Sequence, residues 1–278
     1  MRVKKNFAYF LSRFALVALV CMTFFPFVMM INMSLKKTLD IKLHFLAWPA
    51  LGEIYWKNFE KGFEFVSYPI VNSLVVCGIS LVLILTMVSM SGYAFGRLKF
   101  AGKNVFFLMI LAVMMIPYTM LLVPNYTIVR NMGLLNTKWS LIIPYIAGQQ
   151  IFGIVLSKTF FESLPQEMFE AAKIDGATEF QTYTRIALPL SVPTLITVGV
   201  TSTISMYNDY IWPALVLTKG DKIKTFCQIV YNNAAGKGTS DYGMTTAAFI
   251  IGTLPLLIIT LSCLKYYLAG MLDGAVKG

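Results

Sequence analysis

The chain has 278 residues, of which 57% are hydrophobic and 13% charged, and its mean hydropathy is +0.70. Soluble domains carry about 25% charged residues, so this composition cannot cover a water-exposed globule and predicts a membrane protein. The net charge is +10, which lysines and arginines at an anionic lipid surface ordinarily explain. Nucleic-acid binding is disfavoured because no basic stretch alternates with aromatic residues outside the apolar runs.

Six apolar segments are long enough to cross a bilayer, since one helical crossing needs about 20 apolar residues. None shows the alternation of a barrel strand, so all six are expected to be helices. The segments are residues 12–33, 70–95, 105–124, 140–160, 193–217 and 246–268. The sequence therefore predicts an all-α membrane protein with a single transmembrane domain over residues 1–278.

The first segment follows a basic start, as a signal peptide does. However, it approaches spanning length, and Asn32–Leu35 offers no small-residue cleavage site, so it is interpreted as an uncleaved helix. Prolines inside five segments predict kinks or breaks, which membrane helices tolerate where neighbours or a water-filled cavity satisfy the freed backbone groups. These prolines are Pro26, Pro117, Pro144, Pro213 and Pro255.

A polar interval, residues 161–192, separates the fourth and fifth segments and contains two helix starts. Ser163-Leu-Pro-Gln166 combines an N-cap serine, a first-turn proline and a glutamine three residues on. Asp175-Gly176 predicts the end of this helix, because glycine takes the left-handed position without strain. Thr178-Glu-Phe-Gln181 predicts a second start, and Leu188-Pro189 predicts its end.

Small residues gather at the corner between these two short helices. They permit close approach of another backbone, which could belong to a partner or to this chain itself, and the residues alone do not decide between the two. The small residues are Ala171, Ala172, Gly176 and Ala177, and apolar contact surface comes from Met168, Phe169 and Ile174.

No residues are arranged for catalysis or metal binding. The nearest approach to a phosphate-binding loop, Ala234–Thr239, has Tyr231 where the motif needs glycine and Gly238 where it needs serine or threonine. The single histidine, His44, has no second ligand at metal spacing, and the four cysteines form no Cys-x-x-Cys pair. The sequence therefore predicts no enzymatic activity, metal or cofactor in this chain.

An ion-coupled secondary transporter needs ionisable groups at membrane depth, and only Asp209 lies clearly inside an expected helix. Other polar and aromatic residues are suited to sugars, since amides and carboxylates bond hydroxyls and aromatic faces cover apolar ring surfaces. Alternatively, the amides join helices and the aromatics form an interfacial belt. The candidate substrate-pathway residues are Asn72, Gln149, Tyr207, Asn208, Asp209 and Trp212.

The polar interval contains Glu170-Ala-Ala-x-x-Asp-Gly176-Ala and Ile186-x-Leu-Pro189, which resemble the EAA loop of the membrane-spanning subunits of ATP-binding-cassette (ABC) importers. Motifs along roughly residues 65–217 are similar to the sugar-importer branch, in particular to the smaller maltose-type permease. They are Asn72-Ser-Leu, Gly92-Tyr-Ala-Phe-Gly-Arg97-Leu, Met115-Ile-Pro117, Gly133-Leu-Leu-Asn-Thr137 and Tyr207-Asn-Asp-Tyr-Ile-Trp-Pro213. The resemblance implies the type I importer permease fold, with six transmembrane helices and a cytoplasmic coupling helix.

In that family the EAA loop docks on the cytoplasmic ATPase subunit. The resemblance assigns this role to residues 161–192 and places both termini in the cytoplasm, whereas the count of basic residues does not decide the orientation. By resemblance, the ATPase-coupling residues are Glu170 for polar contacts, Ala171, Ala172 and Ala177 for close seating, and Asp175 and Gly176 for the bend.

The resemblance also implies the function. The chain is expected to be one permease subunit of an ATP-driven importer that moves a sugar or oligosaccharide across the bacterial inner membrane by alternating access. Expected partners are a second homologous permease, two ATP-binding subunits that hold ATP and magnesium, an extracytoplasmic solute-binding protein, the sugar and the lipid bilayer. The alternatives are an importer of a non-sugar solute, an ion-coupled secondary transporter and a membrane-embedded glycan enzyme.

Overall fold

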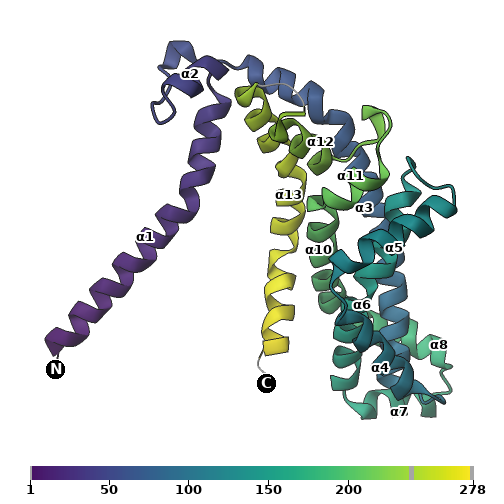
Figure 1. Ribbon diagram of the computed structural model, residues 1–278. Coiled ribbons are helices and arrows are strands. Elements are labelled where there is room, and N and C mark those ends of the chain that lie inside the picture. The colour runs from purple at the N-terminus through teal and green to yellow at the C-terminus, as the bar shows by residue number, and fades with distance from the viewer. Residues whose placement is uncertain (1, 238–240, 276–278) are drawn as a thin grey trace. The chain divides into compact units, whose positions relative to one another are not determined.

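The computed structural model describes residues 2–237 and 241–275, and every regular element within them is helical (Figure 1). The expected all-α class is therefore confirmed. The α-helices are α1 (Arg2–Ser34), α2 (Thr38–Leu43), α3 (Lys57–Arg97), α4 (Lys103–Met114), α5 (Tyr118–Asn131), α6 (Trp139–Ser163), α7 (Gln166–Ile174), α8 (Glu179–Thr182), α9 (Leu188–Leu190), α10 (Val192–Asn208), α11 (Ile211–Val216), α12 (Phe226–Asn232) and α13 (Tyr242–Ala275). Short 3-10 turns lie at Leu51–Glu53 and Asp221–Ile223, and π turns at Tyr183–Ala187 and Asn233–Lys237.

Within the described residues, four helices are each long and apolar enough to cross a membrane. They are Ser12–Ser34 within α1, α3, α6 and Tyr242–Tyr266 within α13. Two bent helix pairs raise the number of crossings to six if each pair counts as one. The expected six-helix membrane protein is therefore met when both bent pairs are counted.

The expected segment 105–124 is not one continuous helix. α4 ends at Met114, and α5 begins at Tyr118 after a bend of 102°. Pro117 lies at the break, as the N-cap of α5. Proline has no amide hydrogen and disfavours a helical conformation in the preceding residue, so the helix does not run through. The expected break at this proline is confirmed.

The expected segment 193–217 is also divided, because the backbone of Asp209 is extended between α10 and α11. The Asp209 carboxylate accepts hydrogen bonds from the backbone amides of Ile211 (3.0 Å) and Trp212 (3.2 Å) and so caps the new helix. The hydroxyl of Tyr145 donates to the other carboxylate oxygen at 2.9 Å. An aspartate cap, which the apolar pattern does not reveal, therefore ends the long helix.

The chain forms two compact units. Unit 1 comprises residues 1–67 and 230–254, and unit 2 comprises residues 68–229 and 255–278. The division passes through α3 and α13. All the candidate site residues lie in unit 2.

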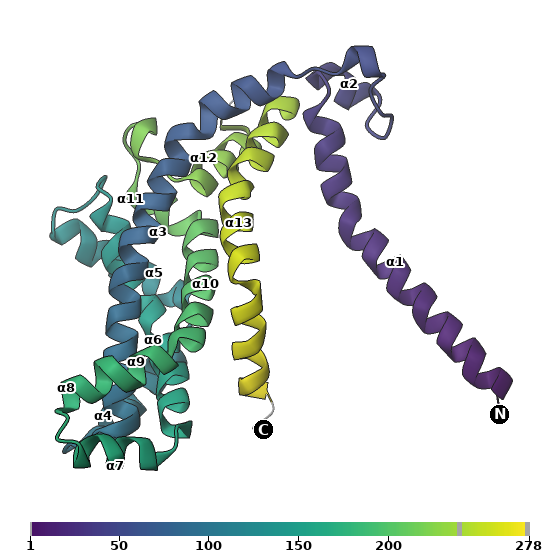
Figure 2. The same ribbon diagram turned by 180° about the vertical axis from the view of Figure 1, so that it is seen from behind.

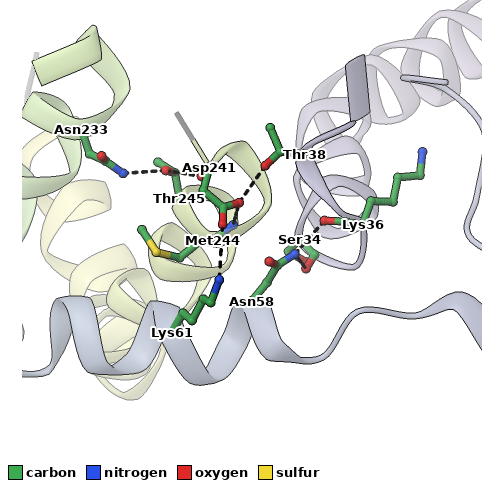
Figure 3. Close-up of polar contacts among 9 residues, drawn as sticks. All are labelled: Ser34, Lys36, Thr38, Asn58, Lys61, Asn233, Asp241, Met244 and Thr245. Carbon is green, nitrogen blue, oxygen red and sulfur yellow. Dashed lines mark hydrogen bonds and ion pairs between the residues drawn. The ribbon is translucent and has the colours of Figure 1, made fainter. Parts of the chain in front are cut away.

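In unit 1, buried polar contacts tie the end of α1 to the beginning of α3 (Figure 3). The side-chain amide of Asn58 donates to the carbonyl oxygens of Ser34 (2.9 Å) and Lys36 (2.7 Å). Gly243 fits against this pair of bonds, because a Cβ atom there would lie 2.4 Å from both Asn58 Nδ2 and the Lys36 carbonyl oxygen. Burial lowers the pKa of the Lys36 amine from its ordinary value, and Asp40 partly opposes this effect.

Asp241 joins the start of α13 to the segment after α1 and to the first turns of α3 (Figure 3). One of its carboxylate oxygens accepts hydrogen bonds from the Thr38 hydroxyl (2.8 Å) and from the Met244 amide (3.1 Å), which caps α13. The other carboxylate oxygen lies 3.9 Å from Lys61 Nζ. The segment after α1, the first turns of α3 and the start of α13 thus meet in one polar junction.

In unit 2, α3 and α6 approach each other closely through glycines on α3. A Cβ atom at Gly92 would lie 2.5 Å from the Ser157 Cβ, and one at Gly96 would lie 2.8 Å from the Phe161 Cβ. Any larger residue at these positions would force the two helices apart. α6 in turn contacts α4, α10 and α11.

Replacing Asn58 by alanine should lower the stability of unit 1. The buried carbonyl groups of Ser34 and Lys36 would lose their donor, and an unsatisfied buried polar group costs roughly 1–3 kcal/mol. The measurement is the thermal unfolding midpoint of the purified protein in detergent. The control Asn104→Ala removes an exposed amide at the start of α4 and should leave the midpoint unchanged. Equal midpoints for the two variants would contradict a stabilising junction.

Candidate functional site

The polar segment between α6 and α10 folds into a sharp corner, with α7 and α8 together at the end of α6 away from α11 (Figures 1 and 2). α7 ends at Ile174, and Gly176 has a φ of +78°. The amides of Gly176 and Ala177 bond to the carbonyl oxygens of Lys173 (3.2 Å) and Ala172 (2.9 Å). This pair of bonds is a Schellman motif, and it confirms the expected helix end at Asp175-Gly176.

The second helix start is also confirmed. The Thr178 hydroxyl oxygen accepts from the Gln181 amide at 3.2 Å, and the Gln181 side-chain oxygen accepts from the Thr178 amide at 2.9 Å. This is a complete capping box. The corner is therefore closed on both sides by local hydrogen bonds.

The expected N-cap role of Ser163 is wrong. α6 continues through Ser163, whose hydroxyl donates to the Phe160 carbonyl at 2.8 Å, and α7 begins after Pro165 without a side-chain cap. The physical reason is tertiary packing, because Phe161 in the last turn is fully buried and holds α6 in helical form.

The expected helix end at Leu188-Pro189 is wrong as well. The second helix runs to Leu190, because the π turn at Tyr183–Ala187 widens it and the Leu188 amide bonds to the Tyr183 carbonyl five residues back. The wider turn accommodates Pro189, which has no amide hydrogen to donate. The chain bends instead at Ser191, with 69° between this helix and α10.

Arg97, the last residue of α3, contacts the segment where α6 passes into α7. Its guanidinium lies over the ring of Phe169 on α7, 4.2 Å from the ring centroid. One of its terminal nitrogens also donates a hydrogen bond to the Leu164 carbonyl, which follows the end of α6. One side chain thus joins the ends of α3 and α6 to α7.

Two more side chains on α3 reach the second arm of the corner. The Tyr93 hydroxyl donates to Glu179 Oε2 at 3.1 Å, and the ring packs edge-on against Phe161 with centroids 5.7 Å apart. The Ser89 hydroxyl pairs with the Tyr183 hydroxyl at 2.7 Å. Tyr93, Phe161 and Tyr183 belong to one buried cluster, so the corner is part of the core of unit 2.

The predicted coupling residues divide between the outside and the inside of the corner. Ala172 is 6% exposed and lines a surface cavity at the corner, and its seating against a partner stays a prediction. Ala177 is half-buried. The remaining four are exposed: Glu170, Ala171, Asp175 and Gly176.

The outer surface of the corner carries exposed apolar side chains. Ile174 at the end of α7 is 86% exposed, and Phe180 in α8 is 69% exposed. Between the two arms lies a surface cavity of about 580 Å³, whose lining includes Ala171, Gly176 and Arg185. A protein surface could therefore seat on the corner through apolar contact.

The predicted substrate-pathway residues are not one open cluster. The side-chain amide of Asn72 donates to the Lys222 carbonyl (2.7 Å), and the indole of Trp212 donates to the Ser140 carbonyl (2.9 Å). Tyr207 packs against Phe226 with ring centroids 5.6 Å apart. Asn72, Tyr207 and Trp212 are all buried, which agrees with the alternative that such residues join helices.

The other three pathway candidates remain more accessible. Asn208 is exposed, Asp209 is half-buried, and Gln149 is half-buried with its amide donating to the Ser205 hydroxyl at 2.8 Å. Asn208 and Asp209 lie where the helix breaks between α10 and α11.

The contacts of Tyr93 and Arg97 are absent from the sequence-based predictions, although both lie in the motif Gly92-Tyr-Ala-Phe-Gly-Arg97. The signal that could have found them is the spacing of four residues, which places glycines on one stripe of the helix and Tyr93 and Arg97 on the neighbouring stripe. Their partners lie far along the chain, and no local pattern identifies them.

Residues 88–270 match the protein family described as the inner membrane component of binding-protein-dependent transport systems. The chain belongs to this family. Its members are the permease subunits of ABC importers, so the expectations of a transport subunit rather than an enzyme, and of a multi-pass inner-membrane protein, are confirmed.

Relatives of this permease match most of its length. It is 35% identical over 277 residues to a putative ABC transporter permease protein (ORF2) of Caldicellulosiruptor sp., with 99% of this chain and 98% of the relative covered. It is 30% identical over 213 residues to the arabinooligosaccharides transport system permease protein AraQ of Halalkalibacterium halodurans, covering 74% and 73%. It is 28% identical over 270 residues to the trehalose/maltose transport system permease protein MalG of Thermococcus litoralis, covering 95% and 94%.

Two solved structures share the fold of this permease. One is a bacterial ABC transporter involved in the import of the acidic polysaccharide alginate, with a TM-score of 0.82, 21% identity, and 96% of this chain and 98% of that chain covered. The other is a bacterial alginate ABC transporter in complex with an alginate pentasaccharide-bound periplasmic protein, with a TM-score of 0.69, 19% identity, and coverage of 95% and 96%. The expected type I importer permease fold is confirmed.

Replacing Gly176 by proline should abolish transport. Proline cannot adopt the positive φ of this position and has no amide to donate to Lys173, so the corner between α7 and α8 would not close. The measurement is solute uptake by cells with equal amounts of each variant in the membrane. Gly176→Asn is the matched control and should retain most uptake, because asparagine tolerates the left-handed conformation. Normal uptake by the proline variant would contradict a role for the corner.

Proposed function

We propose that this permease is one of two membrane-spanning subunits of an ATP-driven importer for a sugar or oligosaccharide. The substrate class is supported by the names of two relatives that match 74% and 95% of the chain, which are transport permeases for arabinooligosaccharides and for trehalose and maltose. An importer of a non-sugar solute is the competing function within the family.

The proposed site of energy input is the corner formed by α7 and α8. The observation that carries this role is a closed, capped corner seated on α3 and α6, with Ile174 and Phe180 exposed on its outer surface. We add Ile174 as the apolar anchor to the six residues assigned to ATPase contact, which are Glu170, Ala171, Ala172, Asp175, Gly176 and Ala177. ATP and magnesium would be bound by the partner ATPase subunits, and this chain would supply no catalytic group.

The orientation follows from this assignment. If the corner contacts a cytoplasmic ATPase, then α7 and α8 face the cytoplasm and both chain termini lie on the same side. The complete importer would comprise a second homologous permease, two ATPase subunits and an extracytoplasmic solute-binding protein. The family description supports the solute-binding protein, and so does the periplasmic protein bound in the related alginate transporter.

Transport would proceed by alternating access. Closure of the ATPase pair on ATP would displace the docked corner, and the corner would bias the membrane helices between inward-facing and outward-facing arrangements. The corner does not need to touch the solute. It would shift the equilibrium between the two arrangements because the ATPase contacts it differently in each one.

For the solute pathway we propose Asn208 and Gln149 as lining residues. Irregular backbone at membrane depth is tolerated where it lies within protein or lines a water-filled cavity, and Asn208 lies exposed at the break between α10 and α11. Asn72, Tyr207 and Trp212 support the pathway from within the protein, and Asp209 holds the break open by capping α11.

Replacing Ile174 by glutamate should prevent assembly with the ATPase subunits, because a charge would occupy the centre of an apolar contact and lose its hydration. The measurement is the amount of ATPase that co-purifies with the tagged permease, with an expected loss of about tenfold or more for roughly 1.4 kcal/mol of lost binding free energy. Leu51→Glu is the control, since Leu51 is 93% exposed and lies in unit 1. Undiminished co-purification of the Ile174 variant would remove the proposed docking surface.

The substrate class is tested by deleting this chain from its host. Uptake of radiolabelled glucose, maltose, raffinose, arabinotriose, methionine and phosphate should fall for at least one sugar and for neither methionine nor phosphate. Restoration by the wild-type chain, and not by Gly176→Pro, ties the loss to this permease. A deletion that impairs only methionine or phosphate uptake would overturn the assignment to sugars.

A further inference from the structure

Arg97 makes two different kinds of contact at the end of α3. Its guanidinium stacks on Phe169, with 4.2 Å between the guanidinium carbon and the ring centroid, and it also donates to the Leu164 carbonyl. In the described part of the chain, no carboxylate lies within ion-pairing distance of Arg97. The contact is therefore a stack with one carbonyl bond, and it depends on where the Phe169 ring lies.

The Leu164 carbonyl has no hydrogen-bond donor within α6, and Arg97 supplies one. Leu164 is the C-cap of α6 and has an extended backbone, with ψ of 144°, and Pro165 after it has no amide hydrogen. Carbonyl groups at a helix end have no partner within the helix, so the Arg97 donor stabilises the exit from α6 into α7. The guanidinium also lies at the C-terminus of α3, where the helix dipole favours a positive charge.

Arg97 is one of three residues spaced by four along α3, together with Ser89 and Tyr93. This spacing places all three on one face of the helix. From that face Ser89 contacts Tyr183, Tyr93 contacts Glu179, and Arg97 contacts Phe169, so both arms of the corner are attached to α3. The Tyr93 ring also lies against Phe169 on α7, with centroids 6.5 Å apart, and Arg97 adds both the stack on Phe169 and the bond to the Leu164 carbonyl before α7.

From this geometry we infer that Arg97 is the positioning residue that makes α7 and α3 move together. The inference rests on the proposed docking of α7 on an ATPase subunit. With the stack in place, a displacement of α7 shifts the end of α3, and α3 carries the shift into the membrane along its close contact with α6 at Gly92 and Gly96. Without the stack, α7 keeps the tilted contact between Tyr93 and Phe169 but loses the Arg97 link, so α7 shifts relative to the end of α3 and less solute moves for each ATP hydrolysed.

A lysine cannot take the place of Arg97. A guanidinium is planar, so it stacks on an aromatic face and at the same time donates in its own plane, whereas an ammonium is a compact point charge. Arg97→Lys therefore keeps the charge but cannot lie flat on the ring and donate to the Leu164 carbonyl at the same time, so it should behave as Arg97→Met does. This similarity separates a positioning role from a purely electrostatic one.

The test uses the complete importer with its ATPase subunits, purified in a cysteine-free background with spin labels at positions 99 and 167. Lys99 and Glu167 are exposed, on the α3–α4 turn and on α7 respectively, and Glu167 is outside the proposed ATPase contact. In the wild type, the distribution of distances between the two labels should be narrow, and it should be the same in the nucleotide-free and ATP-vanadate states. In Arg97→Met and Arg97→Lys this distribution should be broader, and its mean should differ between the two states.

The second readout is the amount of labelled sugar imported per ATP hydrolysed, with the sugar that the deletion strain fails to take up. This ratio should fall about fivefold to tenfold in both Arg97 variants, the size expected for losing a partly desolvated cation–π contact. Basal ATP hydrolysis and the yield of complex should stay within about twofold of wild type. Lys103→Met removes a cation whose hydrogen bond, among the described residues, goes to the Leu98 carbonyl, and it should leave both readouts unchanged.

Phe169→Leu removes the other half of the stack and keeps an apolar residue. Phe169 also packs against Tyr93, so the double variant Arg97→Met/Phe169→Leu should be no worse than Phe169→Leu alone. Additive losses, or a wild-type transport ratio in Arg97→Met and Arg97→Lys, would overturn the inference. Loss of ATPase co-purification from the unmodified chain would instead overturn the proposed function, so the two failures are distinguishable.

Discussion

The close approach of α3 and α6 is the constraint on which the site depends. A Cβ atom at Gly92 or Gly96 would collide with Ser157 or Phe161, so the two helices can lie this near each other only because both positions are glycine. The approach turns the neighbouring stripe of α3 toward the corner, and Tyr93 and Arg97 then reach their partners. If α3 lay further away, the corner would keep its local capping hydrogen bonds but would lose its packing contacts with α3.

The parts of the fold that follow from local chemistry could be predicted from the sequence. Gly176 and Thr178 act through backbone conformation and through hydrogen bonds within a few residues, so their roles can be predicted from the local sequence. The same is true of the helix break at Pro117. Ser163 and Pro189 show the limit of such patterns. Burial of Phe161 and a π turn prolong both helices past the residues that would end them in isolation.

What could not be predicted depends on contacts between distant segments. A small residue such as Ala172 allows close approach by this chain or by a partner, and the sequence alone does not show that it is buried within this chain. The amide of Asn72 and the indole of Trp212 have the same ambiguity, since groups that could bond a sugar hydroxyl bond backbone carbonyls of this chain instead. Asp209 ends a helix by capping its successor, which composition cannot reveal.

The Schellman motif at Gly176 has a consequence for how this permease can change. Its two bonds run between backbone groups, so the angle of the corner requires only a glycine at one position and not any particular outward side chain. Substitutions at Ile174 or Glu170 can therefore alter which surface the corner recognises without altering its shape. Gly176 sets the angle of the corner, whereas Ile174 and Glu170 determine what it contacts. Substitutions on the outer face alone can therefore fit a permease of this kind to a different ATPase subunit.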